Sequence, residues 1–274
     1  MKSKYSFSSK KTKRATMSPK MLKQKEKYPE MLEKIINESD IILEILDARF
    51  PEKTRNFEVE KQIKEKNKKI ILVLNKSDLV EKNPNPVPSG ISISCKTRKN
   101  IRKLRDKIKI ISKKIKTQNE RIIVGVIGYP NTGKSSLINL LVGKNSAPVG
   151  SDAGFTKGIQ KLKLTNEIIL LDTPGVIPQK EYSSYEKDKI AEHTIVGGRS
   201  YSQVKEPEMI ISELMKQYPN ILEKHYKTKT NGDAEILLEQ LGKKFNYFKK
   251  GGEIDFDKTA RKILKDWQTG VIKI

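Results

Sequence analysis

The sequence predicts an α/β domain with a mostly parallel, six-stranded sheet, followed by a small all-helical domain. Short apolar segments alternate with stretches of helical periodicity through residue 173. This alternation is typical of parallel sheets covered by helices on both faces. After about residue 180 no further apolar strand segment occurs, and the rest of the chain shows only helical patterns.

Six segments have the pattern of strands. Four are short apolar runs, and the last two form an expected hairpin with its turn at Asn166. The expected strands are IILEILDA (41–48), KIILVLN (69–75), ISISC (91–95), IIVGVIG (122–128), IQKLKLT (159–165) and EIILLDT (167–173).

Helical periodicity fills most of the intervals between these strands. We expect helices at 28–40, 57–67, 100–116 and 135–143 in the α/β domain. The helix at 100–116 combines one apolar stripe with a strongly basic outer face. Three further helical patterns follow, at 209–226, 234–245 and 255–270.

The chain therefore divides into three parts. Residues 1–27 are rich in lysine and arginine with few large apolar residues, which predicts a flexible basic arm. The α/β domain is expected at 28–180 and the helical domain at 181–274.

The composition restricts the environment and the partners. A net charge of +23 and a pI near 9.8 favour a polyanionic partner such as RNA or a ribonucleoprotein; the alternative is charge that serves solubility alone. The single cysteine, Cys95, indicates a reducing compartment. Apolar runs fall short of the roughly 20 residues that span a bilayer, and the N-terminus is not a secretory signal. We expect a cytoplasmic protein without membrane contact.

The stretch GYPNTGKSS (128–136) has the spacing of a phosphate-binding loop and lies between an apolar strand and a helix. Glycines let the backbone wrap round phosphates, and exposed N–H groups supply positive partial charge. Lys134 is expected at the β- and γ-phosphates and Ser135 at Mg²⁺. The alternative is a simple glycine turn. The candidate nucleotide-binding residues of this loop are Gly128, Asn131, Thr132, Gly133, Lys134, Ser135 and Ser136.

Two downstream loops supply the remaining catalytic and metal candidates. LLDTPG (170–175) places Asp172 where a carboxylate holds Mg²⁺ through water, and Gly175 where a backbone N–H meets the γ-phosphate. SDAGFTKG (151–158) offers Thr156 as a second hydroxyl for the ion. An ordinary Asp-Thr-Pro-Gly turn and an ordinary loop threonine are the alternatives.

The tetrapeptide NKSD (75–78) follows a buried strand and has the pattern of a guanine-binding loop. Asp78 can accept from guanine N1 and the exocyclic amine, Asn75 would tie the base site to the phosphate loop, and the Lys76 stem would lie over the ring. ISCK follows the next strand, where backbone N–H groups around Cys95 could meet guanine O6; its candidates are Ser94, Cys95 and Lys96. The alternative is a chance match.

The order of these loops is unusual. The base loops precede the phosphate loop, whereas a GTPase usually begins with its phosphate loop. One order is a circular permutation of the other, which buried strands tolerate because they depend on neighbours and not on chain order. Segment 96–121 would join the old termini, and the loop at 172–175 would lead directly into the helical domain.

These motifs resemble the circularly permuted GTPases of the YlqF/YawG type, which act in large ribosomal subunit assembly. The resemblance rests on DARFP (47–51), NKSDL, SCK, GYPNTGKSSLIN, GFT, DTPG and the C-terminal KKGGEIDFDKTARKILKDWQTGVI (249–272), in the family's order. It implies GTP hydrolysis to GDP with Mg²⁺, and a helical domain that contacts ribosomal RNA or a large-subunit precursor.

The resemblance also bears on the rate of hydrolysis. Val176 occupies the position of the water-positioning glutamine, which implies slow hydrolysis without an activator. An asparagine matching Asn131 is associated with K⁺ in related GTPases. The N-terminal histidine of bacterial members has no counterpart here, and we expect structural roles for His193 and His225.

Three functions compete at this point. The first is a monomeric GTPase that assembles ribosomes. The second is a GTP-gated RNA- or protein-binding switch outside ribosome assembly. The third is an ATP-using P-loop enzyme, which NKSD disfavours. The candidate RNA-binding patches are the arm 1–27, the face of 100–116 and a C-terminal cluster of Lys243, Lys244, Lys249 and Lys250.

Overall fold

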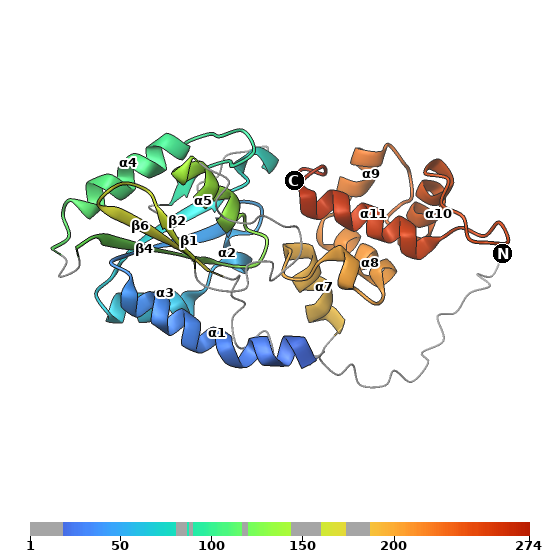
Figure 1. Cartoon of the computed structure of the whole chain (residues 1–274). Coiled ribbons are helices and arrows are strands. Elements are labelled where there is room, and N and C mark those ends of the chain that lie inside the picture. The colour runs from blue at the N-terminus through green and yellow to red at the C-terminus, as the bar shows by residue number, and fades with distance from the viewer. Residues whose placement is uncertain (1–18, 81–86, 88–89, 117–119, 144–159, 174–186) are drawn as a thin grey trace.

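The computed structural model describes residues 19–80, 87, 90–116, 120–143, 160–173 and 187–274. Figure 1 shows these residues as a sheet layered between helices, with a group of helices beside it. The predicted α/β architecture followed by helices is confirmed.

One six-stranded sheet forms the centre of the α/β part, in the order β3-β2-β1-β4-β6-β5. Neighbouring strands are parallel except β5 and β6, which form the expected antiparallel hairpin. The strands are β1 (Ile41–Asp47), β2 (Lys69–Asn75), β3 (Ile91–Ser92), β4 (Ile122–Gly128), β5 (Gln160–Lys163) and β6 (Ile168–Asp172). The third strand is shorter than the expected 91–95.

The register of β1 places the site. Asp47, the last residue of β1, pairs with Asn75 on one side, and Ile45 pairs with Gly128 on the other. The base loop, the loop after β1 and the phosphate loop therefore all begin at one edge of the sheet, the carboxyl edge where ligands bind in folds of this kind.

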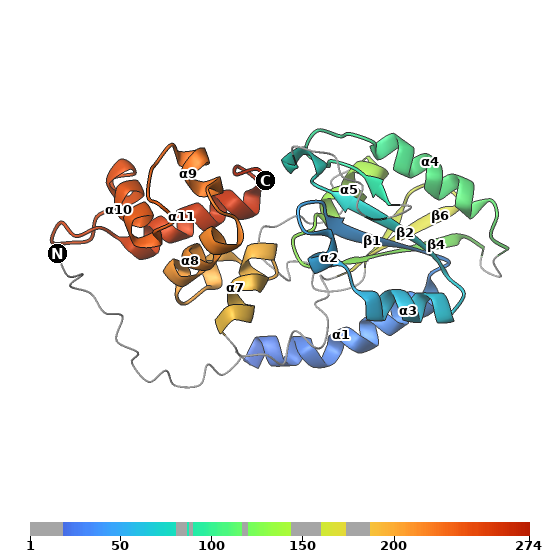
Figure 2. The same cartoon turned by 180° about the vertical axis from the view of Figure 1, so that it is seen from behind.

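Helices cover both faces of the sheet (Figures 1 and 2). Alternate residues of β1 face opposite layers: Ile41, Leu43 and Ile45 pack in the core with α4 (Ile101–Ser112) and α5 (Lys134–Val142). Ile42 packs with α1 (Pro19–Glu38) and α3 (Phe57–Glu65). The short elements α2 (Pro51–Thr54) and η1 (Ser77–Leu79) follow β1 and β2.

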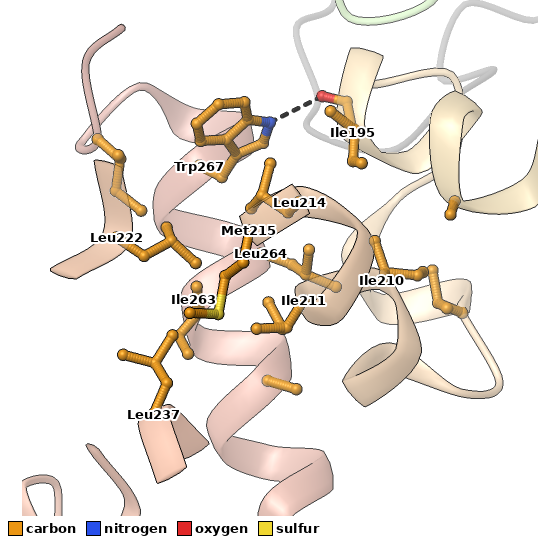
Figure 3. Close-up of a cluster of buried hydrophobic side chains, with 14 of the residues drawn as sticks. Ile195, Ile210, Ile211, Leu214, Met215, Leu222, Leu237, Ile263, Leu264 and Trp267 are labelled. Carbon is orange, nitrogen blue, oxygen red and sulfur yellow. Dashed lines mark hydrogen bonds between the residues drawn. The ribbon is translucent and has the colours of Figure 1, made fainter. Parts of the chain in front are cut away.

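The helices after the sheet share a hydrophobic core that includes Trp267 (Figure 3). The indole Nε1 of Trp267 donates to the carbonyl of Ile195 at 2.8 Å, which satisfies the one polar atom of a completely buried ring. The elements are α7 (Lys187–Val196), η2 (Tyr201–Gln203), α8 (Pro207–Gln217), α9 (Ile221–Tyr226), α10 (Ala234–Lys244) and α11 (Phe256–Thr269). Two residues of the α/β domain, Phe50 and Tyr129, are buried in this same core.

Some element boundaries differ from the sequence expectation. Helix α1 begins at Pro19, so it takes in part of the expected flexible arm 1–27 and begins ahead of the expected helix at 28–40. Proline suits the first helical position, and the lysine, methionine and leucine residues after it favour helix. The expected helix 209–226 is two helices, because Pro219 follows α8 and Asn220 has a left-handed φ of 63°. The residues 174–186, around the expected domain boundary, lie outside the described part.

Among the helices in the described ranges, none has the length and apolar character needed to cross a membrane.

Candidate nucleotide-binding site

The phosphate loop connects β4 to α5 and has little room for side chains. Gly133 has a φ of 93°, and a Cβ placed on it would lie 2.3 Å from Nδ2 of Asn75. Only glycine fits this position without moving the base loop. Thr132 is buried, and its hydroxyl donates to the carbonyl of Tyr129 at 2.9 Å, which braces the loop internally.

Lys134 is the first residue of α5 and is buried. Its ammonium donates to the carbonyls of Gly128 at 3.0 Å and Tyr129 at 2.9 Å, so it lies within the curve of the loop. Burial lowers the pKa of Lys134 to about 8, and the nearby Asp172 carboxylate opposes the shift. Phosphate oxygens beside this ammonium would favour its charged form in the same way.

The two described metal candidates lie together. Ser135 donates its hydroxyl to Oδ2 of Asp172 at 3.0 Å, which joins the first turn of α5 to the end of β6. Asp172 is completely buried, and within the described residues its Oδ1 has no hydrogen-bond partner. Burial raises the pKa of Asp172, while the hydrogen bond from Ser135 lowers it.

A hydroxyl beside a buried carboxylate fits Mg²⁺, which takes few protein ligands together with water and phosphate oxygens. No cluster of three or more acidic, histidine or cysteine side chains suited to a metal occurs in the part of the chain that the structure describes. The oxygen donors therefore fit an ion that is bound jointly with a nucleotide.

Asn75 connects three loops. Its Nδ2 donates to the carbonyl of Thr132 in the phosphate loop at 2.8 Å, and its Oδ1 accepts from the backbone N–H of Cys95 at 3.0 Å. Asn75 is buried at the end of β2. Asn75 therefore already accepts the hydrogen of the Cys95 N–H. That backbone N–H groups around Cys95 meet guanine O6 stays a prediction.

The other base-loop residues are fixed by neighbours. Asp78, on η1, accepts from the hydroxyl of Ser94 at 2.6 Å, and that hydroxyl accepts in turn from the N–H of Thr97. The Asp78 carboxylate is thus held in one orientation by the second base loop. Lys76 has a left-handed φ of 64°, and its Nζ lies 2.8 Å from Oδ2 of Asp47. Two further predicted nucleotide-binding residues are Lys96, which directly follows Cys95, and Ser136, which lies in the first turn of α5.

Thr156 and Gly175 lie outside the described residues, as does Val176. The structure brings together the base loops, the phosphate loop and Asp172, and says nothing of the two remaining catalytic candidates.

Asp47 and Arg49 are site residues to which the sequence assigned no chemical role. They belong to DARFP, a polar interruption directly after a buried strand, which is a signal that could have identified them. Their side chains are each only 1% exposed and pair with each other at 2.7 Å.

Known proteins resemble this chain along most of its length. A family model described as a 50S ribosome-binding GTPase matches residues 123–238. The match begins in β4, the strand before the phosphate loop, and does not include the base loop at 75–78. An uncharacterised GTP-binding protein from Methanocaldococcus jannaschii is 40% identical over 250 residues, which is 88% of this chain and 64% of that protein. Nuclear/nucleolar GTPase 2 from Arabidopsis thaliana is 35% identical over 253 residues, 88% of this chain and 43% of that protein. The chain thus spans less than two thirds of the length of these relatives.

Two solved structures share the fold. GNP-bound YlqF from T. maritima has a TM-score of 0.62 at 21% identity, with 89% of this chain and 94% of that chain covered. The GDP-bound form has a TM-score of 0.53 at 22% identity, with 87% and 94% covered.

The strand order and the order of the loops define a circularly permuted GTP-binding domain joined to a helical domain. The chain is similar to GTP-binding proteins along most of its length and shares the fold of the circularly permuted GTPase YlqF.

Proposed function

We propose that the protein binds GTP with Mg²⁺, hydrolyses it to GDP and phosphate, and acts in assembly of the large ribosomal subunit by binding its RNA or precursor. One observation carries the nucleotide assignment. Asn75 joins the base loops to the phosphate loop, although these loops stand in reverse order along the chain. A guanine reader and a phosphate cradle are therefore parts of one site.

Each described residue has a definite task in this proposal. Asp78, oriented by Ser94, accepts from guanine N1 and the exocyclic amine. Lys134 donates to the β- and γ-phosphates, and the N-terminus of α5 supplies further positive partial charge. Ser135 and Asp172 hold Mg²⁺, which neutralises developing charge on the phosphate oxygens when bound.

Two finer features are part of the proposal. Thr156 and Gly175 would contact Mg²⁺ and the γ-phosphate, and hydrolysis is slow without an activator because Val176 cannot orient water. K⁺ is proposed as a second cofactor beside Asn131. Single-turnover hydrolysis in Na⁺ and in K⁺ tests this part, and equal rates would remove the potassium site.

The net charge of +23 supports an RNA partner. On α4 and the loop before it, a groove with a volume of about 940 Å³ is lined by four basic residues: Arg98, Arg102, Lys103 and Lys107. In the C-terminal cluster, Lys243 pairs with Glu239 and Lys244 donates to the Tyr226 carbonyl. All four lysines of this cluster, Lys243, Lys244, Lys249 and Lys250, are exposed.

Two experiments test the proposal separately. Replacing Asp78 with asparagine should move the preference from guanosine towards xanthosine nucleotides, because the amide donates where the carboxylate accepts. Unchanged GDP affinity would refute the guanine assignment. Sedimentation with large ribosomal subunits, in GDP and in a non-hydrolysable GTP analogue, tests the ribosomal role. Failure to co-sediment in either state would favour a GTP-gated switch outside ribosome assembly.

A further inference from the structure

Asp47 lies at the centre of a buried charged cluster at the end of β1. Its Oδ1 accepts from the backbone N–H of Arg49 at 3.1 Å and from Nε of the same residue at 3.0 Å. Its Oδ2 accepts from Nη2 of Arg49 at 2.7 Å and from Nζ of Lys76 at 2.8 Å. Asp47 therefore holds the lysine of the base loop and the arginine that follows β1 in one fixed group.

The Asp47 carboxyl of this group is ionised at neutral pH, whereas burial lowers the pKa of Lys76 and the Asp47 carboxylate opposes that shift. Burial alone would raise the pKa of Asp47, but attraction by Lys76 and Arg49 outweighs burial and holds the pKa well below its usual range. A buried carboxylate that pairs with two cations is strongly disfavoured when either partner is removed. Lys76 is thus tied to β1 as well as to its own loop.

Arg49 extends the group to the helical domain. Its Nη1 donates to the carbonyl of Trp267 at 2.8 Å, across 218 positions of sequence. Trp267 lies in the last turn of α11, where its carbonyl also accepts from the N–H of Gly270 at 3.3 Å and where a cation is favourable. The guanidinium carbon also lies 5.0 Å from the ring centre of Phe50 and 5.9 Å from that of Trp267.

Other contacts place the helical domain against both nucleotide loops. The N–H of Ile274 donates to the carbonyl of Leu79, at the end of η1, at 3.1 Å. Nδ2 of Asn131 donates to the carbonyl of Gly197 at 2.9 Å. A Cβ on Gly198 would lie 2.7 Å from the ring of Tyr129, so the phosphate loop packs closely on the chain after α7.

We propose that Asp47 and Arg49 are positioning residues for guanine nucleotide binding. They join Lys76 of the base loop to the C-terminal end of α11, so the seating of the helical domain sets the affinity for the base. The inference rests on the proposed function of NKSD. Coupling between two binding events is reciprocal. If a bound polyanion moves α11 away from Arg49 and so changes the affinity for nucleotide by some factor, bound nucleotide changes the affinity for the polyanion by the same factor.

Arg49→Lys is the first test. Lysine keeps a cation beside Asp47 but lacks the planar fork that reaches Asp47 and the Trp267 carbonyl together. Displacement of a fluorescent GDP gives the affinities for GDP and for inorganic pyrophosphate. We expect GDP affinity to fall about fivefold, at the low end of typical couplings between sites, and pyrophosphate affinity to stay unchanged. Trp267, the single tryptophan, should change its emission when GDP binds the wild type and lose that response in Arg49→Lys.

Arg55→Lys is the matched control. Arg55 also pairs with a carboxylate, Glu60, and lies 4.5 Å from the ring centre of Phe57. In the described residues no hydrogen bond or ion pair joins Arg55 to the helical domain, so GDP affinity and the Trp267 response should match wild type. Asp47→Asn supplies a second test, with the same loss of GDP affinity, if Arg49→Lys fails to fold.

The outcomes are distinct. Folded variants at Asp47 and Arg49 with wild-type GDP affinity and Trp267 response would overturn the inference. A parallel loss of GDP and pyrophosphate affinity would also overturn it, because the effect would not act through the base loop. A wild type that binds ADP as well as GDP would instead refute the proposed function.

Discussion

Replacing Glu44 with glutamine should remove a pH dependence from the stability of the α/β domain. Glu44 lies in the middle of β1 on the face that packs against α1 and α3, and it is 1% exposed. Its Oε1 accepts from the N–H of Asn56 at 2.8 Å. Its Oε2 has no hydrogen-bond partner within the described ranges. Burial raises the pKa of Glu44 to about 8, and repulsion by Glu60 adds to the shift.

The sign and size of the effect follow from this pKa. The folded chain keeps the Glu44 proton up to about pH 8, whereas the unfolded chain releases it near 4.5. Stability from this group is complete below pH 4.5 and is lost as the pH rises towards 8. At about 1.4 kcal/mol per pH unit, the loss between roughly pH 5.5 and pH 8 is about 3 kcal/mol. Glutamine resembles the neutral carboxyl and can still accept from Asn56.

Urea unfolding of wild type and Glu44→Gln between pH 5.5 and 8 measures this difference. Far-UV circular dichroism follows the whole chain, and Trp267 fluorescence reports the helical domain separately. Glu65→Gln, an exposed change on α3, is the control and should show no pH-dependent difference. A free-energy difference between Glu44→Gln and wild type that stays constant over this range would show that Glu44 ionises normally, and the reasoning would be wrong.

Three further changes test other parts of the structure. Gly133→Ala should weaken nucleotide binding measurably by fluorescent GDP titration, because its Cβ meets Asn75 at 2.3 Å; wild-type affinity would contradict the close approach. Burial raises the pKa of the Cys95 thiol to about 12, so iodoacetamide at pH 8 should modify the native chain far more slowly than the urea-unfolded chain; equal rates would show an accessible thiolate. Asp255 caps α11 by accepting from the N–H of Lys258 at 3.0 Å. Asp255→Ala should therefore lower the free energy of unfolding by about 1 kcal/mol, measured by urea unfolding with Trp267 fluorescence. An unchanged free energy of unfolding would show that the cap does not stabilise the helix.

The sequence was sufficient for the sheet because the relevant signals are local. Each buried strand is a short apolar run, and the phosphate and base loops each follow such a run directly. Their positions relative to one another follow from the order in which GTPase strands pair, which a permutation leaves unchanged. Boundaries were less accurate where helix-favouring residues follow a proline, as at the start of α1, or where proline and asparagine interrupt a periodic pattern, as between α8 and α9.

Long-range polar contacts were beyond the sequence. Nothing in the spacing of Arg49 and Trp267 indicates that a guanidinium meets the last turn of a helix 218 positions away. Glu44, in contrast, can be recognised from the sequence alone. It is an acid in the middle of an otherwise apolar strand, so burial must change the pKa of its carboxyl group.

The permutation explains why these contacts can exist. Strand β1, which carries Asp47, pairs with β2 on one side and with β4 on the other. The end of β1 therefore lies between the base loop, which follows β2, and the phosphate loop, which follows β4. The chain later forms the helical domain, which contacts the phosphate loop at Gly197, the loop after β1 at Trp267 and the end of η1, next to the base loop, at Ile274. A domain fixed at both loops cannot move as a rigid body without disturbing at least one of them. Its position is therefore physically linked to both loops, and the contact of Arg49 with the Trp267 carbonyl is the link that leads through Asp47 to Lys76 of the base loop.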